Sequence, residues 1–172
     1  MHPQFTHRLD TRRTGERLTN VRKIWYVLVK LFLQKGDKLS IRYFLGDSNS
    51  KQEPSTYFGI AELEKYVLTR QVLDDNCTEI ICPLNVEVAK IILQENPFED
   101  EICPWWDLRI IQGQNDKIIF SSHDWGRGTL MDLDHADLEF LPKHGIDMDY
   151  LISPAFIPNN VTRIINGIPQ PD

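Results

Sequence analysis

The residue types best suited to catalysis or metal binding are concentrated in one segment, residues 122–139. This segment contains two histidines and five acidic side chains, namely His123, Asp124, Asp132, Asp134, His135, Asp137 and Glu139. Carboxylate oxygens bind Mg²⁺, Ca²⁺ or Mn²⁺, and added imidazole nitrogens favour Zn²⁺ or Fe²⁺. A metal-dependent hydrolase that uses His123, Asp132, Asp134 and His135 is therefore one hypothesis for the function.

The spacing within this segment matches neither of two well-known ligand patterns. It lacks the glycine and the bidentate glutamate of a calcium-binding loop, and it lacks the HExxH spacing of a zinc-binding helix. The alternative is a solvated acidic loop that leads into a helix, with Asp134 or Asp137 near the positive end of that helix. We favour this alternative and predict no metal, no cofactor and no catalytic residue.

The three cysteines, Cys77, Cys82 and Cys103, are a weak second candidate for chemistry. Structural zinc sites usually show two close cysteine pairs, whereas here only Cys77 and Cys82 lie near each other in sequence. An odd number of cysteines without an export signal indicates reduced thiols. We interpret all three as small buried hydrophobic side chains.

Two tryptophans are candidates for binding rather than catalysis. A strand that begins at Trp106 would place Trp106 and Leu108 on the core face and Trp105 with Asp107 on a polar face. Trp105 either packs beneath the loop 96–103 or anchors a partner, because tryptophan is enriched among residues that dominate binding energy. The same question applies to Trp125, which lies in a predicted turn between two charged residues.

The distribution of charge along the chain restricts the partners more than any motif does. Residues 1–44 carry a balance of +7, and residues 45–172 carry a balance of −13, which gives the net charge of −6. We expect duplex nucleic acid to avoid the acidic body, because phosphate binding depends on Lys and Arg. A basic protein is expected to be attracted to it.

The elements that position these residues follow from hydrophobic periodicity. We predict a helix that begins after Thr14 or Thr19 and runs to about residue 34, helical spacing over 60–67 and possibly to 72, and a helix at 86–94. We also predict strands at 39–45 and 77–82 and a hairpin formed by 106–112 and 117–123. This pattern indicates an α+β fold with a mixed or antiparallel sheet, a central hairpin and two to three packing helices. We divide the chain into a basic N-terminal arm, residues 1–15, and a single domain, residues 16–172.

No secretory signal and no stretch long enough to cross a membrane is recognised, so we expect a cytoplasmic protein. Charge and size favour a small acidic binding protein that neutralises a basic partner, as immunity proteins and antitoxins do when they block a cationic nuclease. An oligomeric scaffold or homodimer, held by contacts between the arm of one copy and the body of another, is a further alternative. The predicted partner-binding residues are Trp105, Asp107, His123, Asp124, Trp125, Asp132, Asp134, Asp137 and Glu139.

Overall fold

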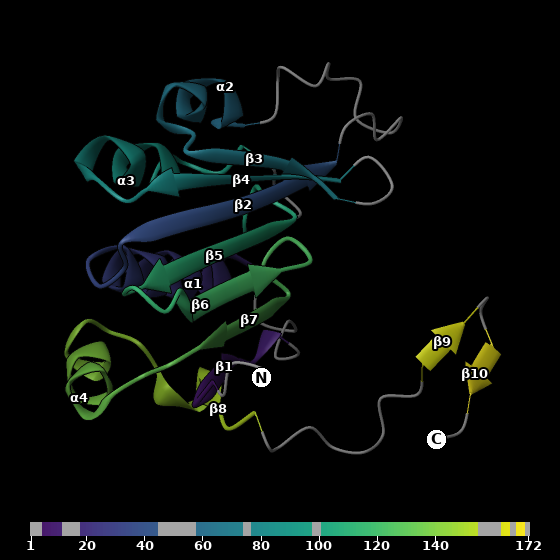
Figure 1. Cartoon of the computed structure of the whole chain (residues 1–172). Coiled ribbons are helices and arrows are strands. Elements are labelled where there is room, and N and C mark those ends of the chain that lie inside the picture. Colours follow the sequence, from purple (N-terminus) through teal and green to yellow (C-terminus); the bar gives the residue numbers. More distant parts are fainter. Residues whose placement is uncertain are drawn as a thin grey trace.

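The protein is built on an eight-stranded antiparallel sheet (Figure 1). The computed structural model describes residues 5–11, 18–44, 58–73, 77–97 and 101–154, and the backbone of Arg163–Ile165 (β9) and Ile168–Gln170 (β10). The strands of the main sheet are β1 (His7–Leu9), β2 (Lys38–Phe44), β3 (Thr69–Val72), β4 (Cys77–Pro83), β5 (Asp107–Gln112), β6 (Lys117–His123), β7 (Gly128–Met131) and β8 (Leu151–Ile152). Their order is β3-β4-β2-β5-β6-β7-β1-β8, and β9 pairs with β10.

The longest helix covers one face of the sheet. Helix α1 (Leu18–Leu33) buries seven apolar side chains at helical spacing, namely Val21, Ile24, Trp25, Leu28, Val29, Phe32 and Leu33. It lies behind β5 and β6 in Figure 1, where the Phe32 and Phe120 rings are 5.2 Å apart and Trp25 Nε1 donates to Ser122 Oγ at 2.8 Å. The other described α-helices are α2 (Ile60–Leu63), α3 (Val86–Ile92) and α4 (His135–Lys143), with short 3₁₀ turns at Glu64–Tyr66 (η3) and Met148–Tyr150 (η4).

The α+β class expected from the sequence is confirmed by these elements. The strands expected on either side of residues 113–116 are present as β5 and β6, and they pair directly. None of the helices in the described ranges has the length and apolar character needed to cross a bilayer.

The expected basic arm is in part a strand of the sheet. Strand β1 lies between β7 and β8, with Arg8 opposite Leu130 and Ile152, and Leu9 is buried. The predicted boundary at residue 15 itself lies outside the described residues. A short stretch such as His7–Leu9 has too little alternation to indicate a strand from sequence alone. Because this stretch pairs within its own sheet, it is not available as a free arm for joining two copies.

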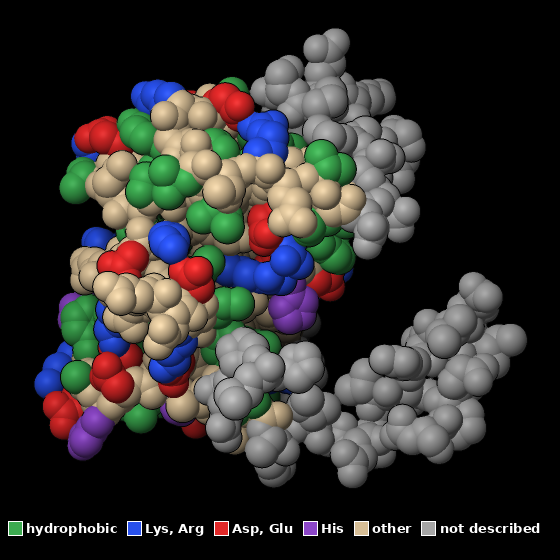
Figure 2. Space-filling model, in the orientation of Figure 1, with side chains coloured by type: hydrophobic (Ala, Val, Ile, Leu, Met, Phe, Trp, Pro, Cys, Tyr) green, Lys and Arg blue, Asp and Glu red, His purple; other side chains and the backbone are tan. Residues whose placement is uncertain are grey.

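The face of the sheet opposite α1 carries a network of ion pairs. Arg42 on β2 lies in register with Glu79 on β4 and Asp107 on β5. Arg42 Nε is 2.9 Å from Glu79 Oε1, and Arg109 Nη2 is 2.6 Å from Asp107 Oδ2. Figure 2 shows acidic and basic side chains interspersed on this face rather than gathered by sign.

Candidate functional site

The predicted partner-binding residues lie at two opposite ends of β6. His123 ends this strand opposite Asp107, and Asp124 and Trp125 follow in the next turn. The backbone N–H of Asp132 instead donates to the Ile119 carbonyl, and Asp132 forms an ion pair with Lys117 at the start of the strand. A strand of this length spans about 20 Å, so these residues do not form one site.

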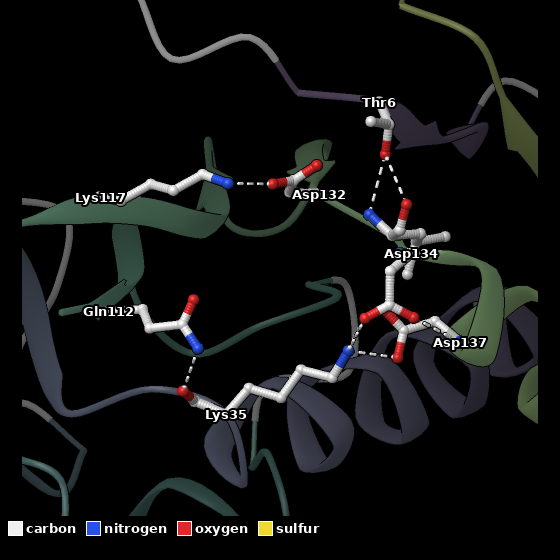
Figure 3. A network of polar contacts seen from close by, with 8 residues as sticks. Thr6, Lys35, Gln112, Lys117, Asp132, Asp134 and Asp137 are labelled. Atoms are coloured by element: carbon white, nitrogen blue, oxygen red, sulfur yellow. Dashed lines mark hydrogen bonds and ion pairs between the residues drawn. The ribbon is translucent and has the colours of Figure 1, made fainter.

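Figure 3 shows that Asp132, Asp134 and Asp137 form ion pairs within the protein. Asp134 caps α4 by accepting from the Asp137 backbone N–H at 2.9 Å, and Asp137 accepts from the Asp134 backbone N–H at 3.0 Å. Lys35 forms ion pairs with both carboxylates, and Lys117 lies 2.5 Å from Asp132. The hydrogen bond from the Asp137 backbone, followed by that from Lys35, lowers the pKa of Asp134.

The pairing of these acids within the protein does not favour the expected acidic contact face, which stays a prediction. Asp137 is 2% exposed, and Glu139 faces His135 at 3.6 Å. The physical reason is that the start of a helix needs acceptors for its free N–H groups, and a capping box uses two carboxylates for this purpose. The interpretation of Asp134 and Asp137 as residues near the positive end of a helix is correct.

The structure also separates the residues proposed for a metal-dependent hydrolase. His123 lies at the opposite end of β6 from Asp132 and Asp134, and His135 is an exposed residue of α4. Within the described ranges, no group of three His, Cys, Asp or Glu side chains is arranged to hold a metal ion. The hydrolase hypothesis therefore has no site at these four residues.

The cysteines are free thiols. Cys82 and Cys103 are buried and Cys77 is partly buried. Burial raises the pKa of Cys82 to about 11 and the pKa of Cys103 to about 12. Both thiols are therefore protonated at neutral pH, which makes them poor nucleophiles and poor metal ligands.

The two adjacent tryptophans do not follow the strand alternation that would place Trp106 in the core and Trp105 on a polar face. Trp105 is 1% exposed, packs against Phe58, and donates its ring N–H to the Phe58 carbonyl at 3.0 Å. Trp106 is only partly buried. The strand begins at Asp107, so the alternation of faces does not extend back to these two residues. Trp105 is therefore a core residue, and its burial favours the packing interpretation over a partner contact.

Three partly exposed aromatic rings meet at the end of the sheet where His123 lies. Phe44 ends β2, Trp106 precedes β5, and Trp125 belongs to the turn between β6 and β7. The Trp106 ring centroid is 5.4 Å from that of Phe44 and 4.9 Å from that of Trp125, both in edge-to-face contact. We call these three residues the sheet-end aromatic cluster. Sequence analysis identified Trp125 as a candidate but missed Phe44 and Trp106.

The turn that presents Trp125 has an unusual backbone. Asp124 and Trp125 both have φ of 51°, and Gly126 has φ of 94°. Positive φ is rare for a bulky residue and costs about 1–3 kcal/mol, and it persists only where surrounding contacts enforce it. Those contacts include hydrogen bonds from Gly126 N to the His123 carbonyl at 3.1 Å and from Cys103 N to the Trp125 carbonyl at 3.0 Å. Strain of this kind is common at functional sites.

The charged groups beside the cluster are of both signs. Asp107 is 3% exposed between Arg42 and Arg109, and Arg127 pairs with Glu101 at 3.4 Å. His123 lies over Gly128, where any Cβ would overlap its ring. A pocket of about 260 Å³ beside this turn is lined by Arg8, His123, Arg127 and their neighbours. The cluster is thus surrounded by polar groups, as the apolar centre of an interface usually is.

The ion-pair network beside the cluster should make the stability of the fold depend on pH. Burial favours a raised pKa for Glu79, but hydrogen bonds from Ser40 and Arg42 outweigh it and hold the pKa below its usual 4.5. Ionised Glu79 therefore stabilises the fold above this usual pKa, and that stabilisation is lost as the pH falls through the lower folded value. We expect Glu79→Gln to destabilise the protein at pH 7, and the difference from wild type to shrink below about pH 4.5.

Urea unfolding between pH 7 and pH 2.5 measures this difference. The exposed Glu62 has no ion pair with another described residue, so Glu62→Gln is the matched control and is expected to have little effect. A destabilisation by Glu79→Gln that stays constant over the whole pH range would contradict the assignment.

No protein-family model, curated protein or solved structure matches the chain. The function of this protein is therefore inferred from the geometry of the described residues.

Proposed function

We propose that this protein binds a cationic protein partner through the sheet-end aromatic cluster. The observation that supports this most is the backbone of Trp125, which keeps a positive φ and leaves a large aromatic ring partly exposed. A turn selected only for stability would have glycine or asparagine at such a position. A tryptophan that is held at this position despite the backbone strain supports a use for the exposed ring.

Aromatic residues of this kind are typical anchors of protein interfaces. Trp and Tyr dominate binding energy where they lie near the centre of a contact and are surrounded by polar groups that exclude water. The cluster has Asp124, His123 and Arg127 around it, and the first two of these were predicted to contact a partner.

The net charge supports a cationic partner. At −6, the chain attracts basic proteins at long range and raises the rate of encounter, although its acids are spread over the surface and many are paired. Inhibition of a cationic nuclease, as by an immunity protein or antitoxin, fits this combination of long-range attraction and an aromatic anchor. In this proposal the anchor is the aromatic cluster, not the acids 132–139.

The proposal is tested with Trp125→Ala against a panel of purified cationic toxin nuclease domains, with lysozyme and cytochrome c as cationic controls. We expect one nuclease to bind more tightly than the controls. Trp125→Ala should then weaken that binding by about tenfold or more, mainly through faster dissociation. Added salt should slow association.

The matched control is Val86→Ala, which removes an exposed apolar side chain at the start of α3. We expect this variant to bind as wild type. Binding that survives Trp125→Ala but is lost in the double variant Asp132→Asn, Glu139→Gln would place the contact at the opposite end of the sheet. A panel in which no nuclease exceeds the controls would contradict the proposed partner class.

A further inference from the structure

A groove between α1 and the end of α3 has the properties of a ligand site. Its volume is about 640 Å³, within the range of small-molecule sites. One wall is a single face of α1, formed by Thr19, Arg22, Lys23 and Tyr26 at helical spacing. The apolar part of the lining comprises Trp25, Val27, Ile92, Leu93, Ile102 and Pro104.

Arg22 contributes a cationic side chain to the lining of this groove. Its Nε donates to the Glu101 carbonyl at 2.6 Å, which fixes the guanidinium, while its Nη2 is buried and has no hydrogen-bond partner. None of the ion pairs between described residues involves Arg22 or the neighbouring Lys23. A buried donor without an acceptor is unfavourable, and a charged donor gains most from an anionic acceptor.

The Glu101 carbonyl that binds Arg22 also binds Asn96, another lining residue of the groove. Asn96 Nδ2 donates to the Glu101 carbonyl at 3.0 Å, and the Tyr26 hydroxyl donates to the Leu93 carbonyl. The bonds of Arg22 and Tyr26 join α1 to the segment after α3, and the bond of Asn96 lies within that segment. The groove is therefore preformed, which reduces the entropy lost when a ligand binds.

We propose that this groove binds a small amphipathic anion. Its apolar body would lie along Trp25, Ile92 and Ile102. Its anionic group would pair with the cationic side chains of Arg22 and Lys23, which line the groove together with one carboxylate, Glu95. The inference is independent of the proposed partner contact, because Phe44, Trp106 and Trp125 do not line the groove.

Calorimetric titration of the full chain with octanoate, 1-octanol and octylammonium tests this inference. The three probes share one apolar tail and differ in the charge of the headgroup. We expect octanoate to bind about tenfold more tightly than 1-octanol, and octylammonium to bind most weakly. Arg22→Gln should remove the preference for octanoate and leave the binding of 1-octanol unchanged.

Lys30→Gln is the matched control, since it removes a positive charge from an exposed position of the same helix that does not line the groove. It should keep the preference for octanoate. Leu93→Trp should fill the groove and block both octanoate and 1-octanol. If Arg22→Gln does not fold, Lys23→Gln replaces it, because Lys23 is exposed on the same wall of the groove, and it should reduce the preference at least threefold.

Equal binding of octanoate and 1-octanol by the wild type would overturn the assignment of an anion to Arg22. Saturable octanoate binding that persists in Leu93→Trp would place the site elsewhere. Absence of saturable binding of any probe would overturn the inference as a whole.

Discussion

Replacing Trp105 with alanine is expected to destabilise the protein by about 3–5 kcal/mol, the range for removing a fully buried aromatic side chain. Trp105 is the largest of the fully buried side chains among the described residues, and its ring N–H donates to the Phe58 carbonyl. The substitution leaves a cavity next to Phe58 and an unpaired carbonyl group. Urea unfolding monitored by circular dichroism measures the change in the free energy of unfolding.

Two further variants show which contribution is lost. Trp105→Phe keeps most of the volume, loses the hydrogen bond and leaves a small cavity, so we expect a cost of about 1–2 kcal/mol. Trp125→Ala removes a partly exposed ring and should cost less than Trp105→Ala. A Trp105→Ala variant that is within 1 kcal/mol of wild type would mean that Trp105 lies at the surface, as an interface residue would.

Replacing Gly126 with alanine is expected to cost about 2–5 kcal/mol and to disturb the turn that carries Trp125. The backbone has φ of 94°, which L-residues rarely adopt. An added Cβ would also lie 2.7 Å from Ile102 Cβ, which is part of the buried core. Backbone strain and overpacking therefore act at the same position, with about 1–2 and 1–3 kcal/mol respectively.

Gly113→Ala separates these two effects. Gly113 also has positive φ, at 72°, but a Cβ there would have no heavy atom within 4 Å. This variant should cost only about 1 kcal/mol, because it adds strain without a clash. Equal costs for the two variants would contradict the tight packing of the turn against Ile102. The edge-to-face contact of Trp106 and Trp125 should give a near-ultraviolet circular dichroism signal that Gly126→Ala reduces.

Elements with strong hydrophobic periodicity were predictable from the sequence. Helix α1 has apolar residues on one face, and β2 alternates between buried Leu39, Ile41 and Tyr43 and the more polar residues between them. Strand β3 was not predicted, because all four of its residues are exposed at the edge of the sheet and show no alternation of burial. Pairing with β4, a long-range contact, is what makes this segment a strand.

The candidate site was only partly predictable for a similar reason. Asp107 and His123 were both identified, but their cross-strand pairing depends on the register of β5 and β6. Phe44 and Trp106 come together with Trp125 only because three chain segments end at the same edge of the sheet. The internal pairing of the acids at positions 132–137 was not predicted because composition cannot distinguish a helix-capping carboxylate from one that is free to bind a partner.

The most direct test of the proposed function follows the four tryptophans separately during binding. Fluorine NMR of protein labelled with 5-fluorotryptophan gives one resonance each for Trp25, Trp105, Trp106 and Trp125, assigned with single Trp→Phe variants. Trp25 and Trp105 are buried and act as internal controls. On addition of the cationic nuclease domain that binds in the panel, we predict that the Trp106 and Trp125 resonances shift while those of Trp25 and Trp105 do not. Binding at saturation that leaves Trp106 and Trp125 unchanged would contradict the assignment of the aromatic cluster as the contact surface.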